Sequence, residues 1–285
     1  MLPGEQAAPP LMSLAVLLII CQFVALEGVA ANPGEPVAII GLIMDDMGNH
    51  RNGGRRVAGL PGPIACSILP HTPHASELAR LCHDMGKVVM LHLPMQPQAR
   101  GITGGPGLLH EEMGREQILS ALHSGLGSVP FARGVNNHMG SHLTRHLTYM
   151  QWVMEDITTR GRLFFVDSYT SVSSVALKVA RENGIPAIGR DVFLDNDPDP
   201  ASIRNQFDRL VTLARREGYA LGIGHPYEAT LALLELELPR LAADGIMLVS
   251  VEDLIQRAVA VGEQQEQTWQ AHLDLSSTDS RKQAP

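Results

Sequence analysis

Short apolar runs alternate with amphipathic stretches along most of the chain. Residues 37–40 (VAII) are all apolar, as expected for a strand buried on both faces of a parallel sheet that helices cover. Further on, Ile203, Phe207, Leu210 and Ala214 recur at the spacing of one buried helix face. The two patterns predict repeated strand–helix units.

The repeats predict an α/β fold with seven or eight strands, either a parallel barrel or an open doubly wound sheet. The glycines after the first strand lack the GxGxxG spacing, which disfavours a dinucleotide-binding domain. The expected strands are 37–44, 64–69, 88–93, 132–136, 163–166, 187–189, 220–223 and 247–251. The expected helices lie around 74–85, 115–126, 143–160, 172–183, 200–217 and 229–243.

The N-terminus carries an apolar run, residues 11–26, broken only by Ser13 and Gln22 and followed by small residues. This pattern predicts a signal peptide over 1–31 and an exported protein, periplasmic or secreted. The first ten residues contain Glu5 and no Lys or Arg, so an uncleaved anchor in the inner membrane is the alternative. That anchor would tether the protein to the membrane.

The expected organisation after the leader is simple. A linker at 32–36 precedes one barrel domain over 37–260, and a polar, Gln- and Ser-rich tail at 261–285 is expected to be disordered.

Charge and cysteine content narrow the function. The net charge of −8 argues against nucleic acid as a partner, because such proteins carry a basic face. Beyond the leader, Cys66 falls in an expected strand and Cys82 in an expected helix. We expect both to be buried free thiols.

Acidic and imidazole side chains gather where the expected strands end. The carboxyl ends of parallel barrel strands form one rim, which is where such folds place their reactive groups. Carboxylate oxygen and imidazole nitrogen are ligands for Zn²⁺ or a similar divalent cation, and a catalytic site uses three of them. The residues at strand ends are Asp45, Asp46, His71, His92, His138, Asp167 and His225.

The adjacent Asp45 and Asp46 are expected to have separate roles. Neighbouring residues on a strand point in opposite directions, so one carboxylate can bind the metal while the other acts on the bound water as general base.

Six segments resemble the divergent polysaccharide deacetylase family, a remote branch of the carbohydrate esterases that deacetylate chitooligosaccharides and peptidoglycan. The resemblance covers roughly residues 36–260. It implies a distorted (β/α) barrel of seven or eight strands with outer helices. The segments are IMDDMGN at 43–49, SILPHTPH at 67–74, MLHLPM at 90–95, GVNNHMGS at 134–141, FVDS at 165–168 and GIGHP at 222–226.

The resemblance also implies roles for individual residues. Asp45 matches the catalytic base and His225 the acid that protonates the leaving amine, with Asp167 as a supporting carboxylate. The metal ligands would be Asp46, His92 and His138, and Asn137 and Ser141 are expected to bind substrate. The main deacetylases place two His close together, so Asp46, His138 and His142 form an alternative ligand set.

These features predict a metal-dependent hydrolase, most simply one that uses Zn²⁺ to N-deacetylate an amino-sugar polysaccharide or oligosaccharide of the cell envelope. Two alternatives remain: a non-catalytic envelope protein that binds glycan or scaffolds a partner, and an amidase or esterase for another acyl substrate.

Overall fold

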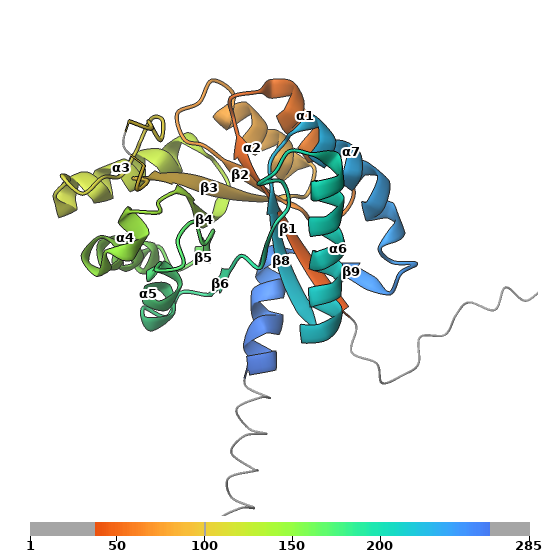
Figure 1. Ribbon diagram of the computed structural model, residues 1–285. Coiled ribbons are helices and arrows are strands. Elements are labelled where there is room, and N and C mark those ends of the chain that lie inside the picture. Colours follow the sequence, from red (N-terminus) through yellow and green to blue (C-terminus); the bar gives the residue numbers. More distant parts are fainter. Residues whose placement is uncertain (1–37, 100, 263–285) are drawn as a thin grey trace, which may run out of the picture. The chain divides into compact units, whose positions relative to one another are not determined.

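The fold is an open, curved barrel of parallel strands with helices outside it (Figure 1). The structure is a computed structural model that describes residues 38–99 and 101–262. In that part of the chain the strand order is β6-β5-β4-β3-β2-β1-β8-β7, and β9 also pairs with β1. The strands are β1 (Ala38–Met47), β2 (Ala65–Ile68), β3 (Val88–Met95), β4 (Ala132–Met139), β5 (Phe164–Asp167), β6 (Ala187–Gly189), β7 (Val192–Phe193), β8 (Tyr219–Gly224) and β9 (Ile246–Leu248).

The barrel is open between β6 and β7, which are not paired within the described residues. The chain nevertheless crosses this opening directly, because β7 follows β6 after Arg190 and Asp191. The backbone N–H of Arg190 donates to Asp167 on one side of the gap, and that of Asp191 donates to Leu221 on the other. The predicted distorted (β/α) barrel is therefore confirmed.

Eight α-helices are described, and most cover the outer face of the sheet. α6 begins where Asp199 accepts hydrogen bonds from the N–H groups of Ala201 and Ser202, and it ends at Gly218 in the left-handed conformation. The helices are α1 (Arg51–Gly59), α2 (Ala75–Asp84), α3 (Arg115–Ser128), α4 (Leu147–Thr159), α5 (Ala176–Glu182), α6 (Pro200–Glu217), α7 (Glu228–Glu237) and a last helix over 251–262. Two 3₁₀ turns, η1 (Leu143–Arg145) and η2 (Leu238–Arg240), precede α4 and follow α7.

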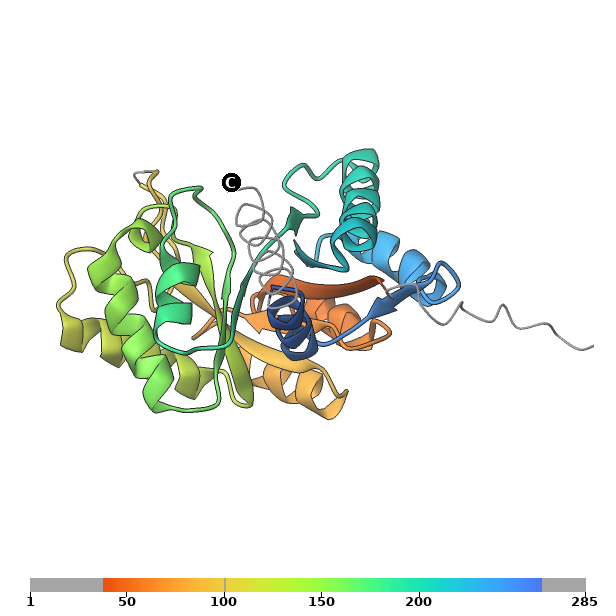
Figure 2. The same cartoon turned by 90° about the horizontal axis from the view of Figure 1, so that it is seen from below.

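Two apolar cores lie on opposite faces of the strands. On β1, Ile40 and Leu42 face the outer helices, whereas Ile39 and Ile43 face the inside of the barrel. The last helix fills the inside near the amino ends of the strands, and it is the dark blue helix in Figure 2. Gly41 permits this contact, because a Cβ there would lie 2.8 Å from Leu254 Cδ2.

Three elements were not predicted. α1 contains glycines and little apolar surface, and it is held by packing: a side chain at Gly54 would overlap Leu78 of α2. β7 has two residues, too few for a periodic signal. The last helix was not among the predicted helices, and tertiary packing supplies its buried face. The expected helix 143–160 is interrupted and becomes η1 and α4.

The prediction of free thiols is wrong. Cys66 of β2 and Cys82 of α2 form a disulfide with a Cα–Cα separation of 6.6 Å. The reason is the short connection between the two elements, which brings the helix back onto the strand that precedes it and turns both side chains toward each other.

The predicted signal peptide or anchor, the linker and most of the polar tail lie outside the described residues. Within 38–99 and 101–262, no helix has the length and apolar character needed to cross a membrane.

Candidate active site

A bulge in β1 brings Asp45 and Asp46 into the same pocket. Between Met44 and Met47 the register against β2 slips by one residue, and Asp46 adopts a positive φ of 56°. In a regular strand the two carboxylates would point to opposite faces, whereas an extra residue re-aims a side chain. Asp46 thus stores backbone strain of the kind that clusters at functional sites.

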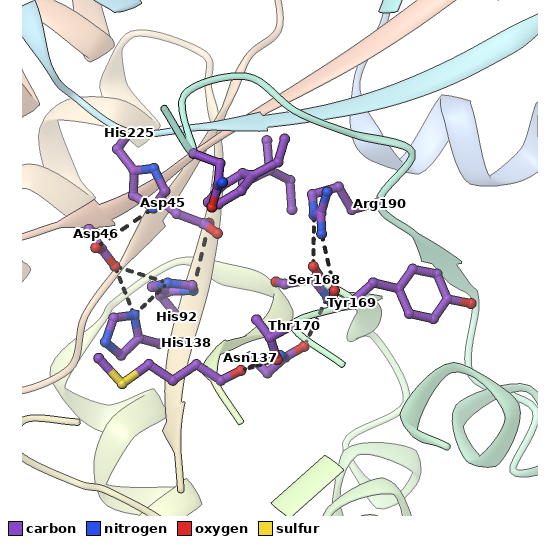
Figure 3. Close-up of a pocket in the computed structure, with 14 residues that line it drawn as sticks. Asp45, Asp46, His92, Asn137, His138, Ser168, Tyr169, Thr170, Arg190 and His225 are labelled. Atoms are coloured by element: carbon purple, nitrogen blue, oxygen red, sulfur yellow. Dashed lines mark hydrogen bonds and ion pairs between the residues drawn. The ribbon is translucent and has the colours of Figure 1, made fainter. Parts of the chain in front are cut away.

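Asp46, His92 and His138 form a compact cluster on the carboxyl-terminal halves of β1, β3 and β4 (Figure 3). Asp46 Oδ1 lies 3.1 Å from His92 Nε2 and 2.9 Å from His138 Nδ1, and the two nitrogens are 3.1 Å apart. Three ligands around one Zn²⁺ at about 2.0–2.1 Å would lie about 3.4 Å apart, so the spacing is close to that of a metal-bound set.

The hydrogen bonding of Asp46 gives an independent test of this fit. Its Oδ1 is buried, yet no group among the described residues makes a hydrogen bond to it with acceptable geometry. A buried, unsatisfied carboxylate oxygen is costly unless a cation completes the site. The residues present therefore fit a divalent cation, held by Asp46, His92 and His138. The alternative ligand His142 does not belong to this cluster.

Asn136 fixes both Asp45 and His92, which are almost fully buried. Its Nδ2 donates to Asp45 Oδ1 at 2.9 Å, and its Oδ1 lies 2.9 Å from His92 Nδ1 and accepts from Ser67 Oγ at 2.7 Å. Because Asn136 Oδ1 can only accept, Nδ1 of His92 carries a proton, which leaves Nε2 as the nitrogen that would bind a cation. The sequence motif contained Asn136, but no role was predicted for it.

The charges in the cluster shift its pKa values in opposite directions. Burial alone would raise the pKa of Asp46, but the imidazoles of His138 and His92 lower it well below its usual range. Burial alone would lower the pKa of His92, but the charge of Asp45 and the contact with Asp46 raise it to about 9. Asp46 is thus ionised at neutral pH, as a ligand must be.

His225, at the end of β8, lies on the other side of Asp46. Its Nε2 is 3.7 Å from Asp46 Oδ2, and its Nδ1 is 2.8 Å from Asp195 Oδ1. The buried Asp195 carboxylate also accepts from the His225 backbone N–H and from Thr230 Oγ1. Burial opposes protonation of His225, but the hydrogen bond and charge of Asp195 raise its pKa. The ring is therefore held with Nε2 toward the pocket.

The expected partner of His225 was Asp167, and this is wrong. None of the hydrogen bonds of the described residues joins them; the Asp167 carboxylate instead accepts from Ser174 Oγ and from the backbone N–H groups of Tyr169 and Leu177. It organises the connection after β5. Asp195 follows the two-residue β7, and the apolar triplet before it was the one signal in the sequence that could have located it.

The remaining predicted residues take different places. Asn137 lines the pocket, but its amide is engaged by the backbone of Met139 and Ser168. Ser141 does not line it; its Oγ accepts from the N–H of Gln98. Arg190, which was not predicted, lines the pocket, donates to the carbonyls of Ser168 and Tyr169, and stacks over Phe193.

The site opens into a cavity of about 370 Å³. A cavity of this size is in the range of small-molecule sites. The side chains that line it include the carboxylates of Asp45 and Asp46 and the imidazoles of His92, His138 and His225.

Comparison with known proteins finds relatives over most of the chain. Residues 42–255 match the family model described as divergent polysaccharide deacetylase. The chain is 38% identical over 216 residues to the uncharacterized protein YibQ of Escherichia coli (strain K12), covering 76% of this chain and 67% of that protein. It is 33% identical over 215 residues to an uncharacterized protein of Haemophilus influenzae, covering 75% of this chain and 76% of the relative.

A solved structure supports the fold. The uncharacterized protein ATU2773 from Agrobacterium tumefaciens C58 superimposes with a TM-score of 0.73 at 23% identity, covering 79% of this chain and 92% of that one. The family match spans the strands that carry Asp45, His92, His138 and His225. The chain therefore belongs to the divergent polysaccharide deacetylase family.

Proposed function

We propose that the protein is a metal-dependent hydrolase that removes acetyl groups from an amino-sugar polysaccharide or oligosaccharide of the cell envelope. The observation that carries this proposal is the cluster Asp46–His92–His138, with Asp45 on one side and His225 on the other. Zn²⁺ is the cation that one carboxylate and two imidazoles favour.

The cation supplies two effects when bound: it lowers the pKa of a water molecule to about 7, and it polarises the acyl carbonyl. Asp45 is not a ligand in this arrangement. Its carboxylate accepts a hydrogen bond from Asn136 and lines the pocket beside the cluster. Asp45 Oδ1 lies 3.6 Å from His92 Nδ1. From there Asp45 takes the proton of the water whose oxygen adds to the amide carbonyl.

His225 completes the reaction. When the C–N bond breaks, the amine must receive a proton, and His225 Nε2 faces the pocket to deliver it while Asp195 holds the opposite ring nitrogen. The products are acetate and a free amino sugar. The hydrogen bond and charge of Asp195 raise the pKa of His225, which favours the protonated form that this role needs.

Acetate release by purified, metal-analysed protein across a panel of N- and O-acetylated glycans tests the proposal. We expect release from an N-acetylated glycan, and loss of turnover with retained metal in Asp45→Asn. Turnover by Asp45→Asn at the wild-type rate would remove Asp45 as the base. Zinc-loaded wild-type protein that binds the glycans and releases no acetate would identify a binding protein instead.

Export is part of the proposal. Residues 11–31 have the pattern of a signal peptide, and the disulfide between Cys66 and Cys82 suits an oxidising compartment. Fractionation of cells, with alkylation of free thiols before mass analysis, should find a shortened, disulfide-bonded chain outside the cytoplasm. A full-length chain with free thiols in the cytosolic fraction would contradict export.

A further inference from the structure

A second cluster of possible metal ligands lies outside the candidate active site. It consists of Glu111, in the connection between β3 and α3, and of His142 and His146 on either side of the 3₁₀ turn η1. One ligand atom from each residue lies within 4.8 Å of the other two. His142 Nε2 and Glu111 Oε2 are 2.8 Å apart, and the rings of His142 and His146 have centroids 4.6 Å apart.

Backbone and side-chain contacts hold the three residues in register. Gln96, directly after β3, accepts the backbone N–H of Glu111 at its side chain and the backbone N–H of His142 at its carbonyl. The hydroxyl of Tyr149 donates to the Glu111 carbonyl. The two connections are thus fastened at the backbone, and only the ends of the ligand side chains are free to adjust.

The ligand atoms are available for a cation. The Glu111 side chain is 48% exposed and that of His142 25%, so small rotations can bring them to the spacing of about 3.4 Å that one zinc ion requires. Among the described residues, no hydrogen bond occupies the ring nitrogens of His146.

An open coordination side is also present. A cavity of about 520 Å³ adjoins the cluster, lined by Gln96, His110, Glu111, Glu112 and His142 among others. It is separate from the active-site cavity, because the two share no lining residue. Water or one of the neighbouring side chains can fill a fourth position.

We propose that Glu111, His142 and His146 bind a second divalent cation, of the Zn²⁺ class, which fastens the β3–α3 connection to the β4–α4 connection. His142 is four residues after the active-site ligand His138, and Gln98 donates to Ser141 between them. The second cation therefore stabilises the segment between His138 and His142, next to the first site. It contributes no catalytic group.

Zinc titration of the full chain, with metal content measured after removal of free Zn²⁺, tests this proposal. Wild type is expected to bind two Zn²⁺ per chain, and Glu111→Gln and His146→Ala one each. Asp46→Ala is also expected to bind one, at the second site. His123→Ala is the matched control and should bind two Zn²⁺. His123 is likewise an exposed imidazole 2.8 Å from a carboxylate, Asp156, and the described residues place no third ligand beside this pair.

The outcomes separate this proposal from the proposed function. A wild type that binds one Zn²⁺, lost in Asp46→Ala, would overturn the second site and leave the active-site metal intact. Two Zn²⁺ in Asp46→Ala, with one in Glu111→Gln, would overturn the active-site assignment and support the second site. Two Zn²⁺ in both Glu111→Gln and His146→Ala would remove the second site. Equal circular dichroism and melting of the metal-free variants show that folding is unchanged.

Discussion

The two His–carboxylate clusters share their ligand chemistry and differ in what holds them. Asp46, His92 and His138 sit on β1, β3 and β4 of one sheet, and the most buried of them, His92, is 2% exposed. Glu111, His142 and His146 sit on connections, and the side chains of Glu111 and His142 are partly exposed. Strands and buried amides give a fixed geometry, which catalysis needs. The connections between strands and helices give an adjustable geometry, which is sufficient for binding a structural ion.

The largest expected loss of acetate release comes from removing Asp46, the carboxylate ligand of the active-site cluster. Asp46→Ala should abolish acetate release, because the site loses its anionic ligand and two imidazoles remain alone in a buried position. Metal content and acetate release, measured on the same sample, check this. If Asp46→Ala released acetate at the wild-type rate, the cluster of Asp46, His92 and His138 would not be the catalytic one.

Removing the carboxylate that holds His225 should have the next largest effect. Asp195→Asn is expected to lower kcat on the order of 100-fold, the low end for loss of general acid catalysis. Because Asp195 raises the pKa of His225, its removal lowers that pKa, and the protonated acid is lost at a lower pH. The basic limb of the kcat profile should therefore move to lower pH.

Asp167→Asn is the matched control for this variant, since Asp167 contacts the connection after β5 and not His225. Its basic limb should stay at the wild-type pH. A limb that moves in Asp167→Asn and stays in Asp195→Asn would reverse the assignment.

The residues that orient the ligands give a smaller effect. Asn136→Leu should weaken zinc binding at the active site by about 10- to 100-fold, as loss of a hydrogen bond to a ligating imidazole does. His92 loses the acceptor that fixes its ring, so turnover at limiting zinc falls with it. Gln96→Ala, the counterpart at the second cluster, should weaken only the second site. Isothermal titration calorimetry with Zn²⁺ measures the affinity of each of the two sites. Equal weakening of both sites by either variant would show that the clusters are coupled.

The smallest effect on turnover is expected from the second cluster itself. Glu111→Gln should keep most of the wild-type acetate release while it loses one Zn²⁺, because no residue of this cluster lines the active-site cavity. Acetate release at saturating Zn²⁺ measures this. Loss of turnover equal to that of Asp46→Ala would mean that the second cluster takes part in catalysis.

Much of the fold follows from local pattern. The bounds of α6 were predicted to the residue, since Asp199, Pro200 and Gly218 mark its ends and its apolar residues repeat on one face. The apolar runs located eight strands, and the strand-end rule brought Asp45, Asp46, His92, His138 and His225 to one rim. Elements without such signals, α1, β7 and the last helix, were missed.

The sequence by itself determined the repeated strand–helix units and the rim on which the chemistry gathers, because hydrophobic periodicity and strand-end position are local properties. Its six motifs carried the resemblance that implied the family and the barrel. Only the tertiary structure decided how the groups pair. The bulge at Asp46 depends on register against β2, the choice of Asp195 over Asp167 depends on β7 pairing with β8, and the Cys66–Cys82 disulfide depends on how α2 returns to β2. Each of these joins residues through contacts between elements, and such contacts leave no periodic trace along the chain.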